Sequence, residues 1–238
     1  MEKLIAVARA DEFKARCEER LAESKELLDE ILRQGGPRVP ENTLAPYNRL
    51  AMSVGRLWNA VALVRCVHPD AAIRSAAEEG EKEVAKFASG LGLNRDLFEA
   101  ISGCDTSTLD ATGRRLVKHV LRDFRRAGVD RDDATREKVR ALREDLVATG
   151  QECLRNIVKD VRAIELDAAE LDGLPPDYIR ERPSGPSGKV RITTDYPDYN
   201  PFMTYARSGR RRQELYTEFR RRAHPVNVGV LHRLLEKR

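Results

Sequence analysis

Apolar residues recur at helical spacing through the first two thirds of the chain. Five of them share one face of the first predicted helix: Phe13, Cys17, Leu21, Leu28 and Leu32. Spacings of four and seven residues bring side chains to the same side of an α-helix, and Gly35-Gly36-Pro37 ends the segment. The pattern therefore predicts a long amphipathic helix that ends before residue 35.

Two further helices are predicted to pack against each other. The helix that opens near residues 42–43 has six apolar residues on one face: Leu50, Val54, Leu57, Trp58, Val61 and Val64. A helix over about 108–127 has five: Leu116, Val117, Val120, Leu121 and Phe124. We expect Leu57, Trp58 and Val61 to be buried with Leu116, Val120 and Phe124. Replacing an enclosed Trp58 with alanine would then cost about 3 to 5 kcal/mol.

The same pattern predicts three more helices. One begins after Asp70, whose carboxylate can cap it, and a short one follows Asn94. The longest is predicted from Asp132 or Asp133 to about Val161. Six residues form its apolar stripe: Val139, Leu142, Leu146, Cys153, Ile157 and Val161. Residues 1–162 therefore read as a helical N-terminal region.

The composition changes after residue 162. Residues 163–166 and 190–194 alternate apolar and polar side chains, so we expect them to pair as a small antiparallel ribbon. Between them, residues 171–179 predict a turn that leads into a short helix. The Pro-, Gly- and Ser-rich residues 182–188 predict a flexible surface connection.

An aromatic and proline-rich segment, residues 196–202, follows the ribbon and predicts a rigid Tyr-Pro turn. A basic helix follows it. The predicted fold is therefore mostly α: a multi-helix region over 1–162, then a β-ribbon, the Tyr-Pro turn and the basic helix over 163–238.

The charge balance gives little support for a nucleic-acid partner. The chain has 43 basic and 39 acidic residues and a net charge of +4. Its arginine runs, residues 210–212 and 220–222, are separated by Glu214 and Glu218, and no aromatic platform interleaves them. We therefore predict a salt-bridged, partly solvated helix and no nucleic-acid binding.

Membrane and metal signals are weak as well. No segment reaches the roughly 18 to 20 uninterrupted apolar residues of a membrane span, and the apolar stretch 4–8 is shorter than the roughly 7 to 15 residues of a signal peptide. We expect a cytoplasmic chain without membrane contact. Four cysteines without metal-binding spacing are expected to be reduced core thiols: Cys17, Cys66, Cys104 and Cys153.

Four segments in the second half resemble the motifs of a known family in order and spacing. Residues 171–179 are similar to its Leu-x-Gly-Leu-Pro-x-Asp element, and residues 190–204 to its strand followed by Tyr-Pro-x-Tyr-x-Pro. Residues 210–223 resemble its Arg-rich helix, and Asn227 with Leu231 matches an Asn-x-x-x-Leu pattern. The family is the thimet-oligopeptidase family of zinc metallopeptidases, which includes the oligopeptidase A and dipeptidyl carboxypeptidase types. The resemblance extends from about residue 40 to the end.

The resemblance implies a catalytic motif that this chain lacks. In the family, a His-Glu-x-x-His helix and a later Glu bind zinc, and the Glu of the motif polarises the attacking water. None of the four histidines here is followed by Glu or by a second His four residues on: His68, His119, His224 and His232. We therefore assign no catalytic, cofactor-binding or metal-ligating residue. We expect the chain alone to bind no stoichiometric zinc and to cleave no peptide.

The resemblance implies the N-terminal portion of a zinc oligopeptidase, a region that forms part of the wall of a channel for short peptides. Zinc would come with a downstream catalytic portion, because the chain reaches Arg238 before the motif. We expect the apolar face of residues 226–238 to self-associate or fray without that portion. The alternative is a stand-alone helical peptide- or protein-binding module without enzymatic activity. A nucleic-acid adaptor would require salt-sensitive binding to RNA or DNA.

Overall fold

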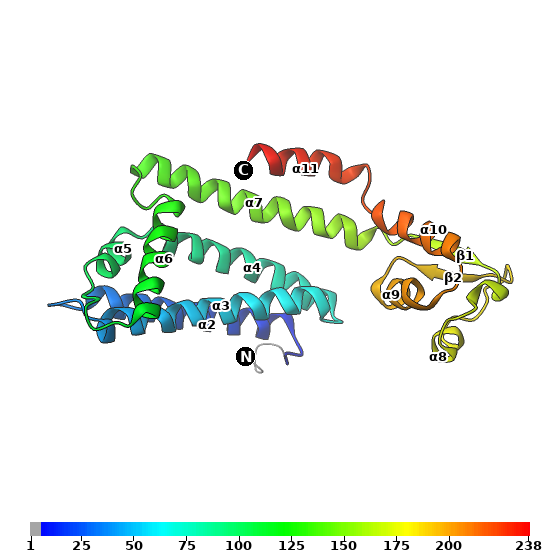
Figure 1. Cartoon of the computed structure of the whole chain (residues 1–238), viewed down its shortest axis with the longest axis horizontal. Coiled ribbons are helices and arrows are strands. Elements are labelled where there is room, and N and C mark those ends of the chain that lie inside the picture. Colours follow the sequence, from blue (N-terminus) through cyan, green and yellow to red (C-terminus); the bar gives the residue numbers. More distant parts are fainter. Residues whose placement is uncertain (1–5) are drawn as a thin grey trace. The chain divides into compact units, whose positions relative to one another are not determined.

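The computed structural model describes residues 6–238 and divides the chain into two compact units, Met1–Ala148 and Thr149–Arg238 (Figure 1). This division falls inside the long helix α7 (Asp133–Lys159) rather than after residue 162. The described residues contain ten α-helices and one two-stranded sheet. The prediction of a mostly α fold with a small antiparallel ribbon is therefore confirmed.

The N-terminal unit is an assembly of helices. In chain order these are α2 (Ala10–Arg33), the π-helical turn η1 (Pro40–Leu44), α3 (Ala45–Val67), α4 (Ala71–Gly92), α5 (Arg95–Ser102), α6 (Ala111–Ala127) and the first part of α7. Asp70 caps α4 as predicted, because its carboxylate accepts the N–H of Ala72 at 2.6 Å.

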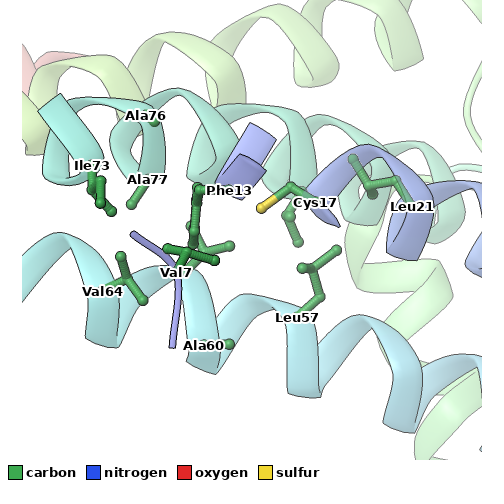
Figure 2. Packing of buried hydrophobic residues seen from close by; sticks show 12 residues of the cluster. Val7, Phe13, Cys17, Leu21, Leu57, Ala60, Val64, Ile73, Ala76 and Ala77 are labelled. Atoms are coloured by element: carbon green, nitrogen blue, oxygen red, sulfur yellow. The ribbon is translucent and has the colours of Figure 1, made fainter. Parts of the chain in front are cut away.

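A first core lies where α2, α3 and α4 meet (Figure 2). Its buried side chains include Phe13, Cys17 and Leu21 from α2, Leu57, Val61 and Val64 from α3, and Ile73, Ala77 and Val84 from α4. Phe13 lies at the centre of the side chains drawn in Figure 2 and is completely buried. Three helices thus share one apolar seam.

A second core joins the far ends of α2 and α3 to α5 and α6. Its fully or nearly buried members are Ile31, Leu50, Leu97, Ala100, Ile101, Val117, Phe124 and Val129. The predicted contact of Trp58 with this group is wrong, because Trp58 is 37% exposed and Leu116 is 50% exposed. Leu57 and Val61 instead belong to the first core. Trp58 follows Leu57 by one residue, which rotates it about 100° away from the buried stripe.

Residues Pro40–Val67 are the one described helical segment long and apolar enough to cross a membrane. Within it, Leu50, Leu57 and Val61 are buried against other helices, each at most 3% exposed. Arg65 also forms an ion pair with Glu81 of α4 at 3.1 Å. We therefore interpret α3 as a core helix of the N-terminal unit.

The C-terminal unit combines the end of α7 with a ribbon and short helices. Its further elements are β1 (Ala163–Leu166), the 3-10 helix η2 (Ala168–Leu171), α8 (Pro176–Arg180), β2 (Val190–Thr193), α9 (Tyr196–Tyr205), α10 (Gly209–Arg220) and α11 (Val226–Glu236). The strands pair antiparallel as predicted, with Ile164 opposite Ile192 and Leu166 opposite Val190. These four side chains are buried and form a third core with Phe202 of α9 and Leu215 of α10, among others.

Residues 196–205 form helix α9 and not the predicted rigid turn. Pro197 stands in the first turn, where a backbone N–H has no helical partner in any case. Pro201 removes the N–H that would reach the carbonyl of Pro197 and crowds that carbonyl, which accepts a hydrogen bond from Arg182 at 3.4 Å instead. Two prolines four residues apart are therefore compatible with a helix that the first of them opens.

The four cysteines differ in their exposure to solvent. Cys17 and Cys104 are buried as predicted, Cys153 is half-buried, and Cys66 is exposed against the prediction. Burial, with a smaller contribution from Glu18, raises the pKa of Cys17 to about 11, so this thiol stays protonated at neutral pH. All four are free thiols.

Candidate functional site

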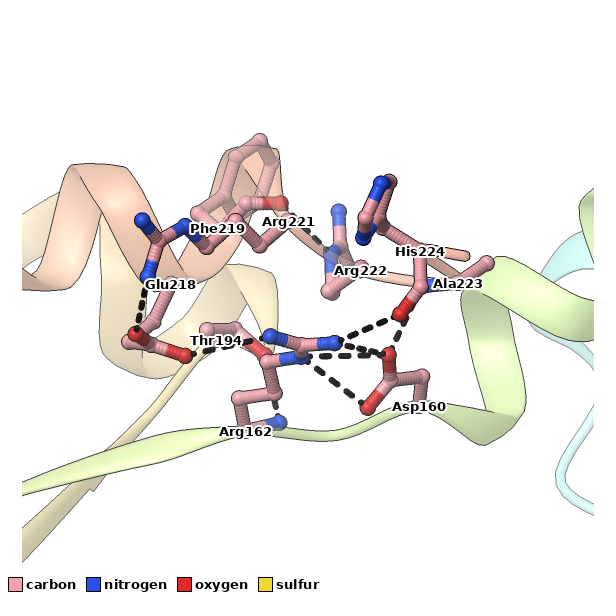
Figure 3. A network of polar contacts seen from close by, with 9 residues as sticks. All are labelled: Asp160, Arg162, Thr194, Glu218, Phe219, Arg221, Arg222, Ala223 and His224. Carbon is pink, nitrogen blue, oxygen red and sulfur yellow. Dashed lines mark hydrogen bonds and ion pairs between the residues drawn. The ribbon is translucent and has the colours of Figure 1, made fainter. Parts of the chain in front are cut away.

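A charged network joins the end of α7 and the start of β1 to the segment before α11 (Figure 3). Asp160 accepts hydrogen bonds from Arg162 Nη2 at 3.0 Å and from the N–H of Ala223 at 2.7 Å. Arg162 also donates to Glu218 at 3.4 Å and to the carbonyl of His224 at 3.3 Å. The bond from Arg162, followed by that from Ala223, lowers the pKa of Asp160. The network therefore fixes the path of the chain into α11.

Ala223 adopts a φ of 61°, in the left-handed region that residues with a Cβ rarely use. It is also buried, at 4% exposed. Its bond to Asp160 holds this conformation, which redirects the chain between α10 and α11. The bond from Ala223 to Asp160 therefore links this turn to the end of α7.

Polar side chains attach α11 to α7 within the C-terminal unit. Asn227 donates to the carbonyl of Cys153 at 3.0 Å and accepts from Asn156 at 2.8 Å. Nearer the end of α11, Arg233 pairs with Glu152 at 2.6 Å, and Lys237 donates to Thr149 at 3.2 Å. The contact between the two helices is thus built largely from hydrogen bonds and an ion pair.

The apolar side chains of the same two helices lie mostly on the outside. Leu154 and Val158 of α7 are 44% and 70% exposed, and Val228, Leu231 and Leu235 of α11 are 45%, 52% and 62% exposed. Each set has helical spacing, so each forms a stripe. We use the name α7–α11 apolar surface for these five residues, which form two separate stripes, one on each helix.

The two buried residues of α7, Thr149 and Gln151, are both polar. In α11 the buried residue is Val230. An amphipathic helix of a complete domain normally places its apolar stripe toward the core. In this helix pair several apolar side chains face outward instead. Contiguous exposed apolar residues are a feature of interaction surfaces.

The basic helix α10 is ion-paired, as predicted. Arg211 binds both carboxylate oxygens of Glu170, at 2.7 and 2.8 Å, and also pairs with Glu214 at 2.7 Å. The bonds to Glu170 first, and then to Glu214, raise the pKa of Arg211. This bidentate pair links α10 to η2, so the arginine serves the fold of the unit.

The prediction that no aromatic platform interleaves the arginines overlooked Tyr216 and Phe219, which lie between the two arginine runs. Arg222 lies over the ring of Phe219 at 4.0 Å from its centroid, and Arg220 lies 5.0 Å from that of Tyr216. Phe219 is also stacked on Tyr199 of α9, with centroids 4.0 Å apart. The aromatic rings of α10 are therefore partly covered by Arg220 on the helix and by Arg222 just after it.

A second polar cluster closes the C-terminal unit around Asp198. Its carboxylate accepts the N–H and hydroxyl of Thr193 at 2.9 and 2.6 Å and forms an ion pair with Arg182 at 2.7 Å. The guanidinium of Arg182 also lies 3.7 Å from the ring centroid of Tyr178. Arg182 is therefore an anchor and does not belong to the flexible connection predicted for residues 182–188.

The contacts of Asp198 predict how the stability of the C-terminal unit depends on pH. Burial favours the protonated form of Asp198, but the bonds from Thr193 and Arg182 outweigh it and lower the pKa. Stability from this group is therefore fully present above the unfolded value of about 3.9 and is lost as pH falls through the lower folded value. We expect Asp198→Asn to reduce stability at pH 7 by about 1.5 to 3 kcal/mol and to flatten the loss at acid pH.

Hydrogen exchange of the β1–β2 amides at pH 7 and, after correction for intrinsic rates, near pH 3 measures this effect. Asp177→Asn serves as the control, because this exposed carboxylate has no hydrogen bond or ion pair within the described part of the chain. An equal change in both variants would contradict the assignment.

The described residues contain no group of three or more His, Cys, Asp or Glu placed to hold a metal ion. His68 follows α3 and accepts the N–H of Asp70 at 3.1 Å, and His119 lies on α6 in the same unit. His224 precedes α11 and His232 lies on it. A zinc site requires three or four converging ligands, so the histidines of residues 6–238 do not fit one.

Part of the chain matches the model of a known protein family. Residues 17–136 match the model of the neurolysin/thimet oligopeptidase N-terminal domain. The chain belongs to this family. The match begins within α2 and ends at the start of α7, and the family resemblance seen in the sequence is confirmed.

Curated relatives extend the similarity beyond that model. The chain is 23% identical over 232 residues to the organellar oligopeptidase A, chloroplastic/mitochondrial, of Arabidopsis thaliana, covering 89% of the chain and 29% of the relative. It is 23% identical over 214 residues to oligopeptidase A of Escherichia coli K12, covering 85% of the chain and 32% of the relative. A probable thimet oligopeptidase of Arabidopsis thaliana is 18% identical over 200 residues, with 83% and 28% covered. The chain thus spans about a third of the length of these relatives.

Proposed function

We propose that this chain is the N-terminal, non-catalytic portion of a zinc-dependent oligopeptidase that acts on short peptides. In this proposal it forms part of the substrate-channel wall, and the α7–α11 apolar surface binds the catalytic portion. That portion supplies the zinc and the general base. Family membership supports the class of enzyme, and the exposed stripes of α7 and α11 support the docking role.

The single observation that favours docking is the distribution of side chains on α7 and α11: polar groups join the two helices and apolar groups are exposed. The contacts between α7 and α11 are mostly hydrogen bonds and an ion pair, whereas Leu154, Val158, Leu231 and Leu235 are exposed. Burying one leucine contributes about 1.5 to 3 kcal/mol. A partner that covers the surface therefore gains several such contributions, while the attachment of α11 is already satisfied.

The experiment combines the purified chain with the catalytic portion of Escherichia coli oligopeptidase A, expressed without the segment that aligns with this chain. We expect a 1:1 complex in analytical ultracentrifugation and protection of the α11 amides from hydrogen exchange. We also expect chelator-sensitive cleavage of a short fluorogenic peptide by the complex and none by the chain alone.

Leu231→Glu should weaken the complex at least about tenfold, because it places a charge in the buried contact. Leu116→Glu is the matched control, since Leu116 of α6 is 50% exposed and Leu231 is 52% exposed. Equal effects of the two substitutions would contradict docking through α11. Cleavage by the chain alone would contradict its non-catalytic role, and failure of the folded portions to associate would favour the stand-alone binding module.

A further inference from the structure

A groove between α2 and α3 lies in the N-terminal unit, on a different set of residues from the α7–α11 apolar surface. Its volume is about 500 Å³. This is within the range of roughly 300 to 1,000 Å³ found for small-ligand sites. It has room for a few residues of an extended chain and not for a folded domain.

The floor of the groove is apolar. Leu57 and Ala60 are 3% and 2% exposed and belong to the first core, so they form a fixed base. Met52 is 46% exposed at the rim, where its flexible thioether can adapt to different apolar groups. A ligand that fills the groove must therefore bring an apolar group.

The walls of the groove are predominantly basic. Four arginines line it, Arg16, Arg20, Arg49 and Arg56, with two glutamates, Glu19 and Glu23. The lining itself has two more positive than negative charges, although Glu12 and Glu30 at its edge pair with Arg16 and Arg49. Low-dielectric walls strengthen such a field inside a cleft, which favours an anionic ligand.

Arg16 and Arg56 have donor groups without a partner among the described residues, whereas the side chains of the other two arginines are paired. Arg20 is paired with Glu23 at 2.7 Å and Arg49 with Glu30 at 2.8 Å. By contrast, the side chain of Arg56 makes no hydrogen bond or ion pair with any residue in the 6–238 range. Arg16 contacts Glu12 through Nη2, but its Nη1 is buried without a hydrogen-bond partner among the described residues. A buried donor left unsatisfied is costly, so a ligand acceptor that the guanidinium of Arg16 reaches by turning into the groove would be favoured.

We propose that the α2–α3 groove binds a short acidic peptide segment. An apolar side chain of the segment rests on Met52, Leu57 and Ala60, and a neighbouring carboxylate accepts hydrogen bonds from Arg16 and Arg56. A nucleic-acid strand fits this site less well, because the floor has no aromatic platform and Glu19 and Glu23 repel a continuous polyanion. This binding does not depend on the proposed peptidase role.

Fluorescence anisotropy with a fluorescein-labelled peptide of sequence Glu-Leu-Asp-Leu-Glu tests the proposal. The neutral analogue Gln-Leu-Asn-Leu-Gln has nearly the same shape and lacks the side-chain carboxylates. We expect the acidic peptide to bind at least about tenfold more tightly, and its affinity to fall between 50 and 300 mM salt.

Arg56→Gln should weaken binding of the acidic peptide about tenfold and leave that of the neutral peptide nearly unchanged. Arg115→Gln of α6 removes the same charge from an exposed arginine outside the groove and should have little effect. Far-UV circular dichroism verifies that both variants are folded. The proposal is overturned by equal binding of the two peptides, by equal effects of the two substitutions, by no binding at millimolar peptide, or by a ten-nucleotide poly(dT) that displaces the peptide.

Discussion

Replacing Phe13 with alanine should lower the free energy of unfolding by about 3 to 5 kcal/mol. Phe13 is completely buried among side chains of α2, α3 and α4, so its loss removes apolar contacts and leaves a cavity where the three helices meet (Figure 2). Urea unfolding followed by far-UV circular dichroism measures the change. A loss below about 1 kcal/mol would contradict the central place of this ring.

Trp58→Ala is the comparison for this experiment. It removes a larger side chain from the same unit, yet Trp58 is 37% exposed and lies outside the buried cores. Its effect should be about 1 kcal/mol or less. If Trp58→Ala lowered the free energy of unfolding more than Phe13→Ala, the buried face of α3 would be the one that carries Trp58.

Gly173→Ala should destabilise the C-terminal unit by about 2 to 5 kcal/mol. Gly173 has a φ of +91°, which costs a residue with a Cβ about 1 to 2 kcal/mol. An added Cβ would also lie 2.5 Å from the carbonyl oxygen of Tyr205 and 2.9 Å from Cγ of Arg207. Overpacking of this kind typically adds about 1 to 3 kcal/mol.

Gly188→Ala separates the two contributions. Gly188 has a φ of +74°, but nothing lies within 4 Å of a Cβ built there. This variant should therefore show only the conformational cost, about 1 kcal/mol. Hydrogen exchange of the β1–β2 amides reports on both variants. Similar losses would show that the segment around Tyr205 moves aside and that the close approach has no energetic weight.

The sequence predicted the helices and the ribbon well because their patterns are local. Glycine and proline marked the ends of α2 and α3, and strand alternation predicted which side chains of 163–166 and 190–193 face inward. The error at Trp58 had a visible signal. Leu50, Val54, Leu57, Val61 and Val64 follow spacings of four and three residues, and Trp58 does not fit that series. Size and hydrophobicity favoured its burial, but position on the helix decided against it.

The candidate sites were less accessible from sequence. An exposed apolar face of α11 was expected, whereas the predicted core stripe of α7 included Leu142 and Val161, which are exposed, and did not include Leu154 or Val158. Periodicity identifies an apolar face without saying what covers it. The α2–α3 groove was not predicted, because its floor uses the edge of the core stripe of α3 and its arginines resemble ordinary solvated charges. Only the packing of the two helices brings them together.

Helix α7 gives the two units one continuous backbone hydrogen-bond ladder. The division after Ala148 lies within its 27 residues. A chain severed there would leave up to four carbonyls and four N–H groups without helical partners. The remaining helical piece, residues 149–159, is shorter than the roughly 12 to 15 residues that an isolated helix needs in water. The two units are packed separately, but the helix that supports α11 begins in the N-terminal unit. Cutting the chain at the boundary between the units would therefore destabilise the end of α7, and with it the surface that the C-terminal fragment was meant to present.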